Sequence, residues 1–133
     1  MEKDLELRTK RFALAVIKFS SSLPRTRELD VLARQLVRAA TSIGANYREA
    51  NRGVSPADFA NKIGTVQKEA AETQYWLELL IESNLCPNQA AASLQEESSE
   101  LLAIFTSIGQ KNEAITFSTF YFTLSTFDDH PRP

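Results

Sequence analysis

The chain has 133 residues, which is enough for one domain with a buried core and too few for two domains of ordinary size. Hydrophobic residues make up 43% and charged residues 24%, a globular composition that excludes a disordered chain, and four Gly with five Pro leave little material for the turns of a β fold. The formal net charge of −2 excludes a protein that coats nucleic acid with its whole surface, so such binding would need a local basic patch.

The composition of the chain also predicts where the protein resides. Charged residues follow Met1 and no apolar segment follows a basic start, so we expect no secretory signal. No apolar run approaches the roughly 20 residues of a membrane span. The single Cys86 fits a reducing compartment, with an intermolecular disulfide as the alternative. We therefore expect a cytoplasmic protein with no membrane partner.

The first two predicted helices differ in the regularity of their apolar residues. Residues 4–21 carry apolar side chains over a wide arc. Pro24 is expected to end this helix, because proline disfavours helix in the residue before it. Residues 28–52 form the second helix, with Gly53 at the position where helices commonly end. At about 100° per residue its apolar side chains share one face. That face consists of Leu29, Leu32, Leu36, Ala39, Ala40, Ile43, Tyr47 and Ala50.

The third and fourth predicted helices complete one domain of residues 1–112. Ser55 as a cap, Pro56 at the first helical position and Asp58 three after the cap predict a helix over residues 56–84. Its apolar residues alternate three and four apart, which is typical of a helix packed along a bundle axis. After a connection that contains Pro87, the fourth helix is predicted over residues 89–112. Four amphipathic helices with short links predict an all-α chain, an antiparallel up-down four-helix bundle.

Residues 113–133 differ in composition from the four predicted helices, because Thr, Ser and Phe replace the strong helix formers. This tail is predicted to be docked or disordered, with a frayed extension of the fourth helix as a further alternative. Its aromatic content makes pure disorder the weaker interpretation. The aromatic residues are Phe117, Phe120, Tyr121, Phe122 and Phe127.

Arginines of the second helix form the candidate nucleic-acid-binding surface. They lie within a roughly 80° arc opposite the apolar face, and a merely solvated face would more often alternate in sign. Two arginines of the preceding loop add to the patch. The alternative is an ordinary solvated helix surface. The candidate residues are Arg34, Arg38, Arg48, Arg52, Arg25 and Arg27.

Two further sets of residues predict contacts between helices or between subunits. Tyr75, Trp76 and Leu79 lie off the apolar stripe of the third helix, where large apolar groups would otherwise face water, so they are predicted at an oligomer interface or under the tail. A polar flank of the second helix needs partners wherever a neighbour covers it, and we expect it to form a polar network. The flank consists of Gln35, Ser42, Asn46 and Glu49.

The signatures of an enzyme or of a metal site are mostly missing from the sequence. His130 is the only histidine and lies in the tail, so nucleophile pairs and multi-histidine metal sites lack components in the bundle. Glu69 and Glu72 lie three residues apart without a nearby histidine, and they are predicted to pair with a lysine or with an arginine of the second helix. We expect no catalytic residue, no metal, no cofactor and no small-molecule substrate.

A family resemblance is carried by Arg38, Ala39, Ala40, Ser42, Ile43, Asn46, Glu49, Phe59 and the block KEAAETQYWLELLIESN over residues 68–84. With these residues the chain resembles, over roughly residues 4–110, the four-helix bundle proteins named after the intervening sequences of 23S ribosomal RNA. The resemblance implies an antiparallel bundle and a homopentameric ring. A similar fold occurs in the accessory proteins of diversity-generating retroelements, which are strongly basic and bind nucleic acid and a reverse transcriptase. The net negative charge of this chain departs from that second group.

Together these features predict a non-enzymatic helical bundle that assembles with itself into a ring-shaped homo-oligomer, with a pentamer favoured. Its expected role is that of a scaffold associated with RNA or with a nucleic-acid-bound protein. The alternative is a protein interaction module with no nucleic-acid role.

Overall fold

The computed structural model describes the backbone of residues 2–128 and, apart from residue 88, the side chains of residues 4–112. This part of the chain contains four α-helices and no strand, so the prediction of an all-α chain is confirmed. The helices are α1 (Glu2–Ser21), α2 (Arg27–Asn51), α3 (Pro56–Glu82) and α4 (Asn88–Asp128).

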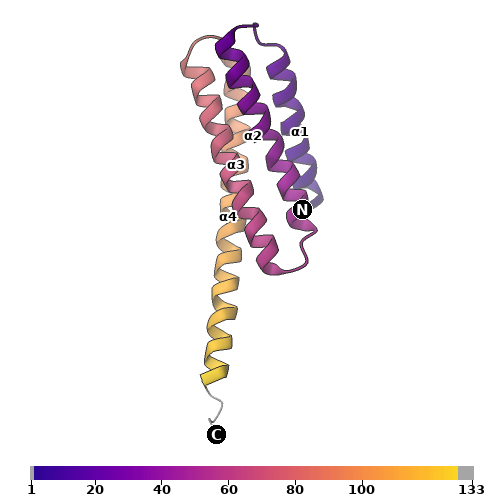
Figure 1. Cartoon of the computed structure of the whole chain (residues 1–133), viewed down its shortest axis with the longest axis vertical. Coiled ribbons are helices and arrows are strands. Elements are labelled where there is room, and N and C mark those ends of the chain that lie inside the picture. Colours follow the sequence, from indigo (N-terminus) through magenta and orange to yellow (C-terminus); the bar gives the residue numbers. More distant parts are fainter. Residues whose placement is uncertain (1, 129–133) are drawn as a thin grey trace.

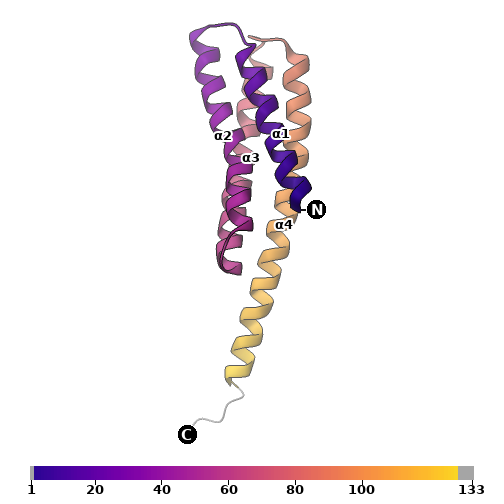
Figure 2. The same cartoon turned by 90° about the vertical axis from the view of Figure 1, so that its right-hand side faces the viewer.

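Each helix packs along the one that precedes it in the sequence, and α4 contacts α1 to close the group (Figure 1). The α2–α3 and α3–α4 pairs make the largest contacts, and α1 and α4 make the smallest. Within the described residues the backbones of α1 and α3 do not come close to each other, so these helices lie diagonally across the bundle. Figures 1 and 2 show the α1–α2 and α3–α4 connections at one end of the bundle and the α2–α3 connection at the other.

Local hydrogen bonds explain where α2 and α3 begin and end. The hydroxyl of Thr26 accepts the backbone N–H of Leu29 at 3.2 Å and caps α2. Ser55 caps α3 in the same way, as its sequence predicts, with Pro56 in the first turn. Asn84 has a φ of 56°, a left-handed conformation that follows the end of α3, which is two residues earlier than predicted.

The core consists of apolar residues contributed by all four helices at three- and four-residue spacing. Across it the rings of Tyr47 and Phe105 meet edge to face, with centroids 5.2 Å apart. Within residues 2–128 no helix combines the length and apolarity required to cross a lipid bilayer. The largest fully buried apolar side chains are Leu29, Leu36, Ile43, Ile63, Leu77, Leu80, Leu101 and Phe105.

The fourth helix is longer than the sequence predicts. We expected it to end near residue 112, whereas its backbone continues as helix to Asp128 and extends beyond the other three helices (Figures 1 and 2). Low helix propensity at each residue is a weak preference, and the preceding turns remove the cost of nucleating a new helix. The helical backbone leads away from the end that carries Leu79, so residues 113–128 do not return to cover it. Residues 129–133 of the predicted tail lie outside the described residues.

Candidate functional site

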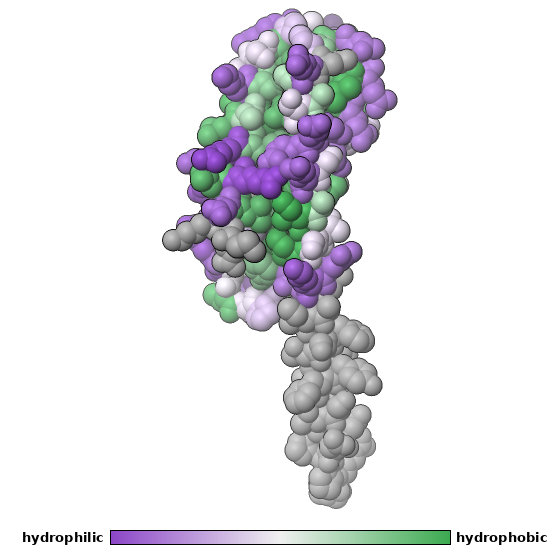
Figure 3. All heavy atoms as spheres, turned by 180° about the vertical axis from the view of Figure 1, so that it is seen from behind, coloured by the Kyte–Doolittle hydropathy of each residue, from purple (hydrophilic) through white to green (hydrophobic). Residues whose placement is uncertain are grey.

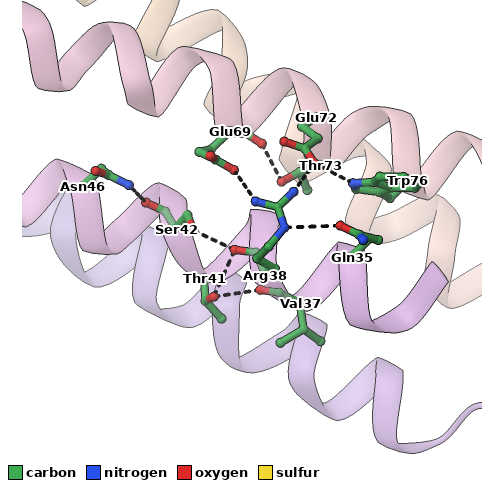
Figure 4. Close-up of polar contacts among 10 residues, drawn as sticks. All are labelled: Gln35, Val37, Arg38, Thr41, Ser42, Asn46, Glu69, Glu72, Thr73 and Trp76. Atoms are coloured by element: carbon green, nitrogen blue, oxygen red, sulfur yellow. Dashed lines mark hydrogen bonds and ion pairs between the residues drawn. The ribbon is translucent and has the colours of Figure 1, made fainter. Parts of the chain in front are cut away.

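Arg38 joins α2 to α3 on the face that the two helices share (Figure 4). Its Nη1 lies 3.4 Å from Oε2 of Glu69, and its Nη2 donates to Oε1 of Glu72. Its Nε donates to Oε1 of Gln35 at 3.2 Å. The predicted pairing of the two glutamates with an arginine of the second helix is therefore confirmed. Arg38 thus belongs to an interhelix ion-pair cluster, with its positive charge already matched by carboxylates.

Trp76 is tied to the same cluster. Its indole Nε1 donates to Oε1 of Glu72 at 3.1 Å, and its ring contacts Tyr75 edge to face with centroids 5.2 Å apart. Trp76 is half-buried and packs against the core, whereas Tyr75 is 52% exposed. Leu79 is half-buried. Of the three predicted interface residues, Tyr75 is therefore the one most open to a partner.

The predicted polar flank does not form one connected network. Ser42 donates to the backbone oxygen of Arg38, and Asn46 donates to that of Ser42, so both bonds stay within α2. Glu49 is exposed and pairs with Lys62 of α3 at 2.6 Å. Gln35 is the member that reaches the Arg38 cluster. Short side chains on a helix find a carbonyl four residues earlier, and this competes with contacts to another helix.

An apolar groove of about 640 Å³ lies between the start of α2 and the end of α3. Val31, Leu32 and Leu79 line it together with Leu85 of the α3–α4 connection. Val31 is 51% exposed and Leu85 is 49% exposed. The sequence pattern predicts only the α3 side of this groove, because the groove forms only when the two helices pack together. We call it the α2–α3 groove.

Arg48 of the predicted arginine surface is also engaged, on the opposite side of α2. Its Nε lies 3.6 Å from Oε1 of Glu6 in α1. The other oxygen of Glu6 accepts a hydrogen bond from Nδ2 of Asn51 at 3.0 Å. Two of the four arginines in the predicted arc are therefore matched by carboxylates from two different helices.

The remaining arginines of the predicted surface are free within the described residues. Arg34 is exposed on α2 and Arg52 is exposed at its C-terminal cap. Arg25 and Arg27 are exposed where the α1–α2 connection enters α2. None of the four has a described carboxylate oxygen within 4.0 Å. The positive surface open to a partner is consequently a sparse row, not a continuous platform.

Arg8 forms a second ion-pair cluster, which was not predicted from the sequence. It donates from Nε and Nη2 to both oxygens of Glu97 at 2.8 and 2.7 Å, and from Nη2 to Glu100 at 2.5 Å. The hydrogen bond to Glu97 raises the pKa of Arg8 further above its ordinary value, and the same bond is the main cause that lowers the pKa of Glu97. The signal in the sequence was the placement of Glu97 and Glu100 on one side of the fourth helix.

Neither a metal cluster nor a reactive thiol emerges in the described part of the chain. No group of three or more His, Cys, Asp or Glu side chains is arranged there to hold a metal. Cys86 is free and buried, and burial raises the pKa of its thiol above the ordinary value. The contacts of Glu69 and Glu72 are those of an ion-pair cluster.

Similarity to known proteins agrees with this fold. Residues 3–107 match the family described as 23S rRNA-intervening sequence protein. The chain belongs to this family. It is also similar, at 36% identity and a TM-score of 0.73, to a crystal structure from Bacteroides thetaiotaomicron described as a protein with unknown function from the S23 ribosomal protein family. The match covers 79% of this chain and 97% of the other. No curated protein matches the chain.

The matched region of this 23S rRNA-intervening sequence protein family member contains both ion-pair clusters and the α2–α3 groove. It ends at residue 107, before the extension of α4. The family resemblance inferred from the sequence is confirmed.

Proposed function

We propose that this protein is a non-enzymatic scaffold of the cytoplasm, an antiparallel up-down four-helix bundle whose copies assemble into a ring, with a pentamer favoured. The observation that carries the proposal is the α2–α3 groove with exposed Tyr75 beside it. Apolar surface of this kind outside the core more often marks a protein interface than an accident of packing. In this proposal Tyr75 and Leu79 contact the neighbouring copy, and Trp76 supports them from behind.

Light scattering on the purified full chain measures assembly directly. A pentamer would have about five times the subunit mass of 14.9 kDa. Tyr75→Glu should shift the population toward lower mass. The matched control is Val54→Glu, because Val54 is 94% exposed in the α2–α3 connection, away from the groove. A wild-type protein that stays monomeric at micromolar concentration contradicts the proposal.

We further propose that the assembled scaffold binds RNA or an RNA-bound protein through its free arginines. Arg34 lies in α2 and Arg52 caps the C-terminal end of that helix, about 27 Å away at 1.5 Å per residue. One subunit would therefore make few phosphate contacts. A ring would repeat the row on each copy, and repetition multiplies weak contacts.

RNA binding is measured by fluorescence anisotropy with a labelled RNA hairpin over a range of salt concentrations. Affinity should fall steeply with salt, and Arg34→Glu combined with Arg52→Glu should weaken it. Lys68→Glu with Lys111→Glu is the charge-matched control, since both lysines are exposed elsewhere on the bundle. Arg38 and Arg48 are unsuitable reporters because their loss also breaks ion pairs within the subunit.

A protein interaction module with no nucleic-acid role is the second candidate function. The pairing of Arg38 and Arg48 with carboxylates favours it, because those guanidinium groups are already matched in charge. Absent or salt-insensitive RNA binding by an oligomeric protein would support this candidate over the RNA scaffold.

A further inference from the structure

We propose that the outer face of α1 docks against the α2–α3 groove of a second copy, so that copies join head to tail. This inference rests on the self-assembly proposed above and names the two surfaces that would meet. The outer face of α1 consists of Leu7, Lys10, Arg11, Leu14, Ile17 and Lys18.

The outer face of α1 exposes large apolar side chains that the bundle does not use. Leu7 is 43% exposed, Leu14 is 56% exposed and Ile17 is 45% exposed, whereas the core-facing residues of the same helix are buried. A helix that packs only within its own bundle normally places polar residues on this side. The face is therefore apolar enough to contact a partner.

The same face is positively charged and its charges are unmatched. Lys10, Arg11 and Lys18 are exposed, and none lies within 4.0 Å of a carboxylate oxygen among the described residues. A partner that covers this face therefore needs an apolar surface edged with carboxylates.

The α2–α3 groove has that combination. Its apolar lining is accompanied by Glu28 and Glu82, and Glu78 is exposed one turn before Glu82. None of these glutamates forms an ion pair within the described residues, and Arg27 is the basic side chain in the lining. In this docking apolar surface faces apolar surface, and the unmatched Lys18 faces unmatched glutamates. This complementarity is the reason to choose a second copy as the occupant.

The two surfaces also lie at the same height along the bundle. Ile17 of α1 is four residues before the end of that helix at Ser21, and Leu79 of the groove is three residues before the end of α3 at Glu82. At 1.5 Å per residue both lie about 5 to 6 Å from the helix ends. Those ends share one end of the bundle (Figures 1 and 2). Two copies placed side by side with parallel axes would therefore bring the surfaces together.

One copy can use both surfaces at once. The backbones of α1 and α3 lie diagonally across the bundle within the described residues, so the outer face of α1 and the α3 side of the groove are on different sides of the molecule. Figure 3, which views the bundle from behind Figure 1, shows apolar surface above and below a hydrophilic band on that one face. A contact between two different patches repeats from copy to copy, and it closes into a ring when the rotation between copies allows.

Charge reversal tests the pairing in sedimentation velocity of the full chain. Variant A carries Lys18→Glu, variant B carries Glu82→Lys, and variant AB carries both, because these two residues lie closest in height along the bundle. Each of A and B should raise the dissociation constant at least about tenfold, because like charges then face each other. Variant AB should recover most of the lost affinity, since opposite charges face each other again.

The control and the alternative outcomes separate this pairing from assembly itself. Lys111→Glu reverses an exposed charge outside both surfaces and should leave the dissociation constant unchanged. Circular dichroism of each variant reports whether the helices remain folded. A monomeric wild-type protein would overturn the proposed self-assembly. An oligomeric wild type whose mass is unaffected by A and B, or an AB variant that recovers nothing, would overturn this pairing and leave self-assembly standing.

Discussion

Arg8 of α1 and Glu97 of α4 are joined by two parallel hydrogen bonds across the seam where neighbouring helices of the bundle contact each other least. The planar guanidinium matches both carboxylate oxygens, and this geometry is stronger than a single charged contact. Both side chains are about one-third exposed, at 37% and 31%, so solvent screens part of their attraction. The pair adds specific contacts where apolar packing between helices is smallest.

Glu97→Gln should lower the free energy of unfolding by about 0.5 to 1 kcal/mol at neutral pH, after allowance for screening. The folded-state pKa of Glu97 is depressed below its ordinary value of 4.5. Its contribution is therefore present above pH 4.5 and is lost as the pH falls through the depressed pKa. Urea denaturation at neutral pH and at a pH of about 3 measures this difference.

Glu96→Gln is the control for that prediction, because Glu96 is exposed and forms no ion pair within the described residues. The wild type and the Glu97→Gln variant should differ at neutral pH and converge in acid. An equal difference between the two proteins at both pH values would contradict the role assigned to the pair.

Arg38→Met should lower the free energy of unfolding by about 1 to 2 kcal/mol, because it leaves the partly buried carboxylates of Glu69 and Glu72 without their cation. The same change should cost less when Glu72 is already Gln, since the two residues interact directly. Chemical denaturation of the four proteins in this double-mutant cycle gives the interaction energy. Trp76 fluorescence supplies a local readout, because its indole donates to Glu72.

Arg34→Met is the matched control on the same helix. Arg34 is exposed and has no described carboxylate partner, so its loss should change the free energy of unfolding by less than about 0.5 kcal/mol. Similar losses for Arg34 and Arg38 would indicate that both act through helix propensity or general charge and not through the cluster.

A chain that stops after Asn112 should fold with a free energy of unfolding within about 1 kcal/mol of the full chain. Ala91, Leu101 and Phe105 of α4 are fully buried in the bundle, and the end of the α4 backbone extends beyond the other three helices (Figures 1 and 2). Thermal and urea denaturation measure the stability. Loss of cooperative unfolding would mean that residues 113–133 complete the core. Light scattering on the same truncated chain tests whether they contribute to assembly, as the docked alternative for the tail predicts.

Most of the fold could be predicted from the periodicity of apolar residues in the sequence. In α2 it identified Leu36, Ile43 and Tyr47 as buried, and Ser55 with Pro56 located the start of α3. These features are local, since the identity of a residue and its spacing decide which face it occupies or whether it can cap a helix.

The partners of charged residues could be predicted only in part. Arg38 and Glu72 lie on two helices joined by a short connection, so their pairing could be predicted from the sequence. Arg8 and Glu97 are 89 residues apart, and no local pattern indicates that α1 and α4 meet at that height. The sequence pattern predicted the arc of arginines. It could not predict that Arg38 pairs with α3 and Arg48 with α1, because this depends on which helix packs against each side of α2.

Two glycines in helix interiors should respond oppositely to alanine. At Gly64, an added Cβ would have no neighbour within 4 Å, so Gly64→Ala should raise the free energy of unfolding by about 0.5 to 1 kcal/mol through helix propensity alone. At Gly44, the added Cβ would lie 3.1 Å from Oγ1 of Thr9 in α1. Thr9 is fully buried and its hydroxyl donates to the backbone oxygen of Leu5 at 2.9 Å, so it cannot retreat without losing that bond.

Gly44→Ala should therefore lower the free energy of unfolding by about 1 kcal/mol, because separation of α1 from α2 outweighs the gain in helix propensity. Removing the neighbour as well should restore the gain, so Gly44→Ala combined with Thr9→Ala should be more stable than Gly44→Ala alone. Urea denaturation of the wild type, of Gly44→Ala and Thr9→Ala alone, and of the double variant measures both effects. A stabilising Gly44→Ala variant would show that α1 can shift outward at little cost, and the close approach of the two helices would then not be a tight constraint.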